Sequence, residues 1–169
     1  IEAYISKKAN MFSDIQAISA MKLIAPNIRT AYHNGKNNKA REKLMLGATL
    51  AGIAFNNSSV ALVHGMSRPI GAFYHVPHGL SNAMLLPTVT EFSIPSAQEK
   101  YANCAKAIGV ADENDIPEVA NKKLMNELIK LNKDLEVPSL EKFGVNKQSF
   151  INNLDKMASQ ALASGSPNN

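Results

Sequence analysis

Apolar residues recur along most of this chain at the three- and four-residue spacing of an α-helix. After Ser13, a residue type that caps helix N-termini, four apolar side chains share one helical face: Ile15, Ile18, Met21 and Ile24. Pro26 lacks a backbone N–H and is expected to end or kink that helix. We find no alternating pattern long enough for a β-strand. The pattern therefore predicts an all-α fold, a helical bundle over residues 1–169.

The same spacing predicts the other helices. Residues 1–6 have apolar positions one helical turn apart and no capping residue before them, so they are expected to end a helix. A long helix is expected from about Lys39 towards His64, and small residues along it permit close helix packing: Gly47, Ala48, Ala51 and Gly52. A turn is expected at 33–38, with His33 at the surface. The remaining expected helices are a short one after Gly79, one from Pro95 to Gly109, and two at 117–134 and 147–163.

The longest uncharged run, Leu44 to Ser67, has the length of a membrane span. It also contains glycines and polar residues that a bilayer disfavours: Gly47, Gly52, Asn56, Asn57, Ser58, Ser59 and His64. The run is therefore interpreted as a buried helix at the centre of the bundle. No membrane partner is expected.

Charge and cysteine usage exclude further classes. The 18 Lys and Arg residues outnumber 14 Asp and Glu residues, but the lysines are scattered among acids, so no nucleic-acid partner is expected. Cys104 is the single cysteine and cannot form an internal disulfide, so it is interpreted as a half-buried helix residue. No signal peptide pattern opens the chain. These features favour a cytoplasmic globular protein.

Candidate chemistry concentrates between Ala61 and Pro87, which hold three of the 4 histidines. His64 is expected near the end of the long helix, and His78 opens the next one directly after Pro77. A loop between them can fold back and bring both rings to one point. Neutral imidazole is a good ligand for iron or zinc, although two ligands are too few for a stable catalytic site. Two interpretations remain: a shared metal, or two rings that each hydrogen-bond at a helix end.

His75 precedes His78 by nearly one helical turn. It is interpreted either as a further metal ligand or as a residue facing the same cleft.

The residues from Val63 to Pro87 resemble the signature of the iron-containing alcohol dehydrogenases, a group with a dehydroquinate-synthase-like fold. The matching pieces are His-Gly-Met at 64–66, Pro-x-Gly-Ala at 69–72, Pro-His-Gly at 77–79, Asn82, and Leu-Leu-Pro at 85–87. The opening I-E-A-Y-I-S and the closing S-G-S-P-N-N (164–169) are also similar to family segments. The resemblance covers the whole chain and is most specific over 60–90.

In that family, an Asp and a His one helical turn apart hold the metal together with two more histidines. The resemblance places the second pair at His64 and His78, and the first pair just upstream of Ile1. The α/β dinucleotide-binding domain also lies upstream, and this chain has no Gly-rich phosphate loop. The resemblance thus implies a single helical metal-binding domain, residues 1–169, cut from a longer enzyme that is expected to be a homo-oligomer.

The implied cofactors are Fe²⁺, with Zn²⁺ as the alternative, and NAD or NADP held mainly by the absent domain. The metal acts as a Lewis acid on the oxygen of a small alcohol or aldehyde, and hydride is exchanged with the nicotinamide. The isolated chain is expected to be inactive and to bind metal poorly, because two ligands are missing.

Arg68 departs from the resemblance. Many family members carry a histidine four residues after the first motif histidine, and that position is Arg68 here. An arginine at this point either binds a carboxylate or the cofactor phosphates, or faces solvent at the rim of the cleft. The substrate is accordingly either a plain alcohol or a hydroxy acid.

Two alternatives remain beside an iron-dependent alcohol dehydrogenase. One is a glycerol- or hydroxyacid-type dehydrogenase, or a dehydroquinate synthase, of the same superfamily. The other is a helical interaction module without chemistry of its own.

Overall fold

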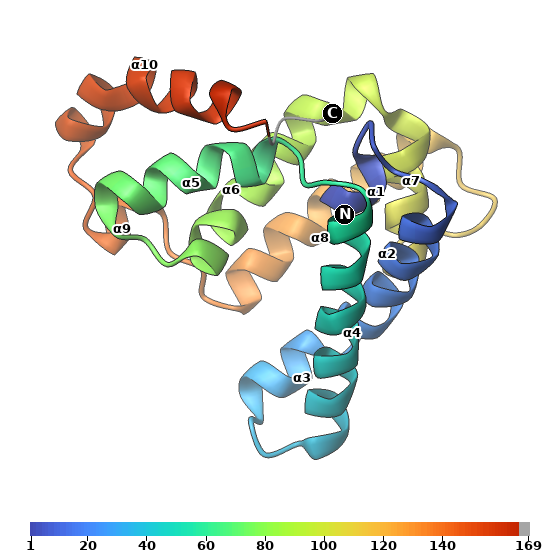
Figure 1. The fold of residues 1–169 in the computed structure, drawn as a ribbon. Helices are drawn as coiled ribbons and strands as arrows, with labels where there is room; N and C mark the ends of the chain where they lie inside the picture. Colours follow the sequence, from blue (N-terminus) through green and yellow to red (C-terminus); the bar gives the residue numbers. More distant parts are fainter. Residues whose placement is uncertain (166–169) are drawn as a thin grey trace.

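The computed structural model describes residues 1–165, which form helices joined by short connections and contain no strand (Figure 1). The helices are α1 (Glu2–Ile5), α2 (Met11–Ile24), α3 (Ile28–His33), α4 (Asn38–Asn57), α5 (Leu62–Tyr74), α6 (His78–Ser93), the 3₁₀ helix η1 (Ile94–Ser96), α7 (Gln98–Ala107), α8 (Pro117–Asp134), α9 (Leu140–Phe143) and α10 (Lys147–Ala163). The all-α prediction is confirmed. Most of the S-G-S-P-N-N segment, residues 166–169, lies outside the described residues.

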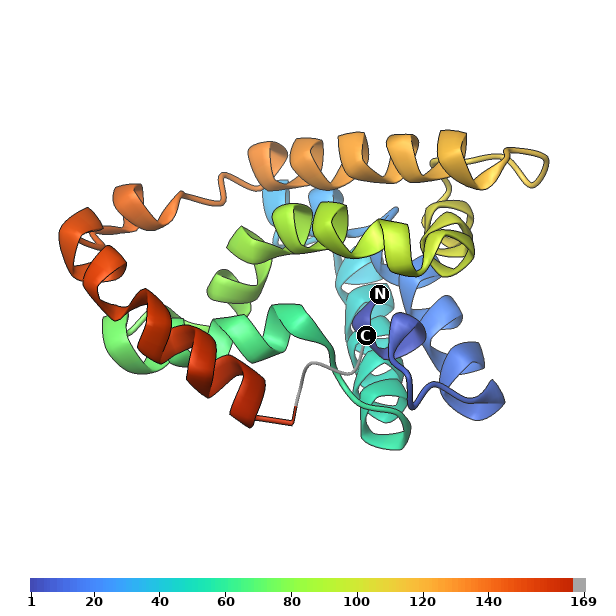
Figure 2. The ribbon, with the colours of Figure 1, turned by 90° about the horizontal axis from the view of Figure 1, so that it is seen from above.

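Two helices, α6 and α8, run side by side; in Figure 2, α8 lies along the upper edge and α6 lies below it, nearer the middle. On one side lie α5, α9 and α10, and on the other lie α1, α2 and α7. The N-terminus lies in the centre, beside α4, in both views. The residues at the start of the chain are therefore close to α4 and to the start of α5.

The main hydrophobic core joins α1, α2, α7 and α8. Its buried members include Ile5, Met21, Tyr101, Leu124 and Leu128. A second, smaller cluster packs α10 against α5 and the connection that follows it, through Ile70, Val76 and Met157. These two clusters hold the helices that carry the candidate histidines.

Helices with strong local signals begin and end where the sequence predicts. The structure has α8 at Pro117–Asp134 and α10 at Lys147–Ala163, as expected. The α2 N-cap is Asn10 rather than Ser13. Ser13 occupies the third helical position, and its Oγ accepts a hydrogen bond from the backbone N–H of Asn10, which completes a capping box.

The predicted long helix from Lys39 towards His64 is wrong, because it is two helices. The side chains of Asn57 and Ser58 hydrogen-bond back to carbonyls one turn earlier, and α4 ends there. The next helix, α5, starts at Leu62 after a bend of 102°. His64 therefore lies in the first turn of a new helix.

The prediction of a buried central helix at Leu44 to Ser67 is also wrong. Only three residues of α4 are buried, at seven-residue intervals along the face that packs on α2: Ala40, Gly47 and Ala54. No single described helix is long and apolar enough to cross a membrane, and α4 with α5 meets that test only as a pair bent by 102°.

Gly47 is buried where α4 packs on α2. A Cβ atom added at Gly47 would lie 2.6 Å from Ile24 Cγ1 and 3.3 Å from Leu23 Cβ. A Cβ atom added at Gly52, on the same helix, would meet no atom within 4 Å. The predicted small-residue face is therefore only partly correct. Gly47 faces α2, whereas Gly52 does not.

This contrast predicts opposite effects for two alanine substitutions in α4. Gly52→Ala should raise the free energy of unfolding by up to about 1 kcal/mol, because alanine is the better helix former. Gly47→Ala should lower it by about 1 kcal/mol, because the cost of separating α2 from α4 exceeds the same propensity gain. Urea unfolding followed by circular dichroism measures both. Equal effects of the two substitutions would contradict the close α2–α4 contact.

Two buried groups in the core predict loss of stability at alkaline pH. Burial raises the pKa of Cys104 from 9.0 to about 11 and that of Tyr101 from 10.0 to about 12. The unfolded chain releases these protons at lower pH than the folded chain, so the unfolding free energy should fall as pH rises above about 9. We expect a slope of about 1 to 2 kcal/mol per pH unit between pH 9 and 11. Cys104→Ala and Tyr101→Phe should each flatten the slope, and an unchanged slope in both would contradict this assignment.

Candidate functional site

The starts of α5 and α6 bring His64 and His78 together. His64 is the third residue of α5, and His78 is the first residue of α6. Their ring centroids lie 5.2 Å apart, with the ring planes at 62°. The return path is not the loop that we expected. It is α5 itself, with Pro69 inside it, followed by the short connection at 75–77.

Asn82 lies between the two rings. It follows His78 by one turn of α6, and its Nδ2 lies 3.3 Å from His64 Nε2 and 3.2 Å from His78 Nε2. An amide NH₂ group has two hydrogens to donate, and an imidazole nitrogen without hydrogen accepts one. Both Nε2 lone pairs are therefore directed at the same point. The Oδ1 atom of Asn82 is buried and has no hydrogen-bond partner among residues 1–165.

Glu2, from α1, contacts the opposite side of the His64 ring. Its Oε2 accepts from His64 Nδ1 at short range. The same carboxylate accepts from the backbone N–H of Val63, at 2.7 Å, and of His64, at 3.3 Å. The Glu2 side chain is only 10% exposed.

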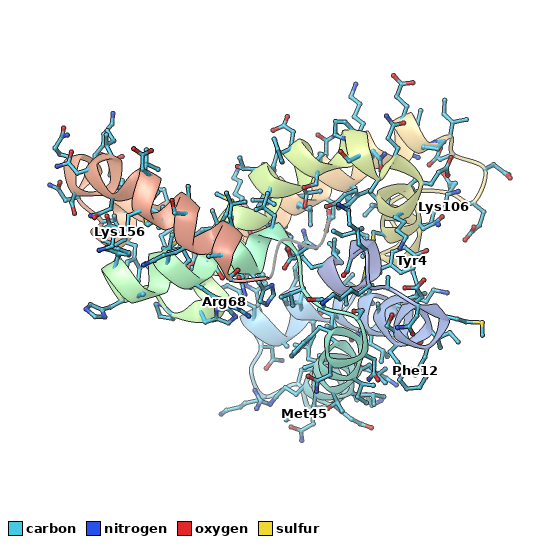
Figure 3. The ribbon with its side chains drawn as sticks, turned by 45° about the horizontal axis from the view of Figure 1, so that its top comes forward. Tyr4, Phe12, Met45, Arg68, Lys106 and Lys156 are labelled. Atoms are coloured by element: carbon cyan, nitrogen blue, oxygen red, sulfur yellow. The ribbon has the colours of Figure 1, made fainter. Side chains whose placement is uncertain are left out.

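His78 is the more open of the two histidines, and its surroundings favour its neutral form. Partial burial, together with the charges of His64 and Arg68, lowers the pKa of His78. Arg68 follows His64 by one turn of α5 and is exposed. In Figure 3 it lies near the middle of the molecule.

The other two histidines lie apart from this pair. His75 ends α5 in a left-handed backbone conformation, and its side chain is exposed. His33 ends α3 at the surface, as predicted, with its ring against Tyr32. Within residues 1–165, no three or more His, Cys, Asp or Glu side chains are grouped to hold a metal, so His75 does not extend the pair to three ligands.

A mainly apolar groove of about 420 Å³ adjoins His64. Its lining includes Glu2, His64 and Asn82, together with apolar side chains of α1, α2, α4, α5, α6 and α8. His64 is thus next to a space lined largely by hydrocarbon. Two imidazole nitrogens that approach one point have the chemistry of a partial site for iron or zinc.

Sequence reasoning did not assign Glu2 and Asn82. Asn82 had a usable signal, since it lies four residues after His78 and shares its helical face. Glu2 had none, because 62 positions separate it from His64 and only the three-dimensional fold brings them together.

Comparison with known proteins gives consistent matches over the whole chain. Residues 1–169 match the model of the Fe-containing alcohol dehydrogenase family, C-terminal. The 1,3-propanediol dehydrogenase of Citrobacter freundii is 38% identical over 166 residues, which cover 98% of this chain and 42% of that protein. The NADPH-dependent butanol dehydrogenase of Clostridium saccharobutylicum is 34% identical over 163 residues, which cover 96% of this chain and 41% of that protein.

A solved structure agrees with these sequence matches. The alcohol dehydrogenase from Oenococcus oeni superimposes with a TM-score of 0.90 at 33% identity, covering 98% of this chain and 43% of that one. The chain therefore spans less than half the length of the relatives that it matches.

Proposed function

Since this chain belongs to the iron-containing alcohol dehydrogenase family, as its C-terminal helical domain, we propose that it forms the metal-binding part of an NAD(P)-linked alcohol dehydrogenase. In this proposal His64 and His78 bind the metal through Nε2. The observation that supports it is the convergence of both Nε2 atoms on the Asn82 amide.

The donor set of this chain fits part of such a metal site. A bound Fe²⁺ ion, or alternatively Zn²⁺, supplies Lewis-acid activation of an alcohol or carbonyl oxygen for hydride exchange with NAD or NADP. His64 and His78 contribute neutral nitrogen donors, and the lowered pKa of His78 favours the unprotonated form that a metal needs. The remaining ligands and the dinucleotide site are proposed to lie in the parent protein, outside this sequence.

The groove beside His64 supports a small substrate with a hydrocarbon portion. Its apolar lining excludes water from one wall of the cleft. Two relatives are named for 1,3-propanediol and butanol, which are small primary alcohols. We therefore propose a small alcohol or the corresponding aldehyde as substrate.

We propose that Arg68 binds an anionic group, either a carboxylate of the substrate or the phosphates of the cofactor. A glycerol- or hydroxyacid-type dehydrogenase is the second candidate function. In the parent protein, Arg68→Ala should raise the KM for that anionic partner by roughly 5- to 150-fold, because a charge-assisted hydrogen bond is lost. Steady-state kinetics with NAD, NADP, plain alcohols and hydroxy acids measures the effect.

Arg41→Ala is the matched control for this measurement, since Arg41 is exposed on α4. A rise confined to hydroxy acids would identify them as substrates. A rise confined to a cofactor would assign Arg68 to its phosphates. Unchanged constants throughout would show that Arg68 only faces solvent.

The expected homo-oligomer has support from apolar side chains at the surface. Several are exposed on α2 and α4, and Figure 3 shows Phe12 and Met45 at the edge of the molecule away from α10. The exposed large apolar residues of these two helices are Met11, Phe12, Ile15, Met45, Leu46, Ile53 and Phe55. We propose that exposed apolar side chains of α2 and α4 take part in self-association of the parent protein.

The proposed function is tested by comparing residues 1–169 with the parent protein, each dialysed against a chelator. We expect the parent protein to retain metal and to reduce NAD or NADP when alcohol is added. We expect the isolated chain to do neither, because a two-histidine site competes poorly with chelators. Stoichiometric metal in the isolated chain would contradict this division of the site. A parent protein without metal or alcohol-dependent turnover would favour the helical interaction module instead.

A further inference from the structure

We propose that Glu2 is a positioning residue that fixes both the place and the tautomer of His64. This inference rests on the proposed function of His64 as a metal ligand. It is carried by three hydrogen bonds that one carboxylate accepts, two from the backbone at the start of α5 and one from the His64 ring.

The backbone contacts fix where α5 begins. The N-cap residue of α5, Ala61, has no side chain that accepts a hydrogen bond, so the first N–H groups of the helix need another partner. Glu2 accepts from two of them, at Val63 and His64. A carboxylate at a helix N-terminus is further favoured by the positive end of the helix dipole. The backbone of His64 is thereby tied to α1.

The ring contact fixes the tautomer. A carboxylate can only accept, so Nδ1 of His64 carries the hydrogen, and in the neutral ring Nε2 then keeps its lone pair. The Asn82 amide nitrogen faces Nε2 and donates to that lone pair, which agrees independently with the same tautomer. A carboxylate behind a ligand imidazole also increases the basicity of the ring nitrogen that binds the metal.

The Glu2 carboxylate is largely buried, so water can supply few of its hydrogen bonds. At 10% exposure the ionised group needs hydrogen-bond donors in place of water, and α5 supplies three.

The test separates capping from tautomer control. In Glu2→Gln, the amide oxygen still accepts from the Val63 N–H, but the amide NH₂ now donates to the ring and favours hydrogen on Nε2. Glu42→Gln, at an exposed position of α4, is the matched control. The ¹⁵N chemical shifts of the His64 imidazole in the metal-free chain report the tautomer directly, and a His64→Asn sample assigns the signal.

We expect hydrogen on Nδ1 in the wild type and in Glu42→Gln, and a shift towards Nε2–H in Glu2→Gln with helix content unchanged. In the parent protein, Glu2→Gln should weaken metal affinity by roughly 10- to 100-fold, and Glu2→Asp should recover part of the loss. A wild-type ring with hydrogen on Nε2 would overturn the proposal, even if Glu2→Gln failed to fold. So would an unchanged tautomer in Glu2→Gln. The tautomer measurement needs no metal, so it is decided separately from the proposed function.

Discussion

Replacing His64 or His78 by alanine in the parent protein should abolish metal retention and alcohol oxidation together. Each substitution removes one of the two nitrogen donors that this domain directs at the Asn82 amide. Water then fills the open ligand position and the metal dissociates readily. The loss in affinity should exceed the roughly 10- to 100-fold typical of residues that only support a ligand. Metal content after dialysis and turnover with NAD and NADP measure the two losses.

His33→Ala is the control for this experiment, because His33 is an exposed histidine at the end of α3. It should keep metal and activity at wild-type levels. His75→Ala should keep the metal as well, since His75 does not join the His64–His78 pair. Full activity in either His64→Ala or His78→Ala would exclude that residue as a ligand.

The parts of the fold that could be predicted from sequence have local causes. Helix α8 begins with Pro117, whose fixed φ suits the first helical position, and α10 begins after Asn146, whose side chain caps it. Those signals lie within a few residues of the helix end, so a single sequence contains them. The predicted bounds of both helices agree with the structure.

Two of the predictions from sequence that were wrong are the single long helix towards His64 and the loop between His64 and His78. Both errors depend on contacts with distant parts of the chain. The bend between α4 and α5 separates two apolar segments with compatible periodicity, and α5 starts where Glu2 can accept from its N–H groups. Pro69 looked like part of a loop, yet it lies inside α5, where it removes a single helical hydrogen bond. The packing of α5 against α6 and α10 holds the helix together despite this loss.

The candidate site also combines features that the sequence indicated with features that only the tertiary structure provides. The positions of His64 and His78 in the sequence, with the family resemblance, suggested that both rings meet. Their actual approach needs the bend after α4, the Glu2 contact and the first turn of α6. The sequence thus pointed to His64 and His78, whereas the tertiary structure brings their two rings together.

Asn82→Asp should convert the pair of histidines into a three-ligand metal site within this chain. The substituted carboxylate takes the shape of the amide but has no hydrogen to donate. It would then lie at the point where the amide nitrogen is now 3.3 Å from His64 Nε2 and 3.2 Å from His78 Nε2. Three acceptors this close together repel each other without a cation, and a cation held between them would have two histidine ligands and one carboxylate ligand.

We therefore expect two linked effects in the chain of residues 1–169. Without metal, Asn82→Asp should be less stable than the wild type, because the amide donor is lost and a charge is added. With Zn²⁺ or Co²⁺, it should bind at least about 100-fold more tightly than the wild type and recover its stability. Thermal unfolding with and without metal measures stability, and the visible absorption of bound Co²⁺ reports the ligand geometry. Asn82→Ala is the control, because it removes the amide without adding a ligand. If Asn82→Asp bound no more tightly than Asn82→Ala, the two Nε2 atoms would not converge on a metal-sized site, and the assignment of His64 and His78 as a ligand pair would be wrong.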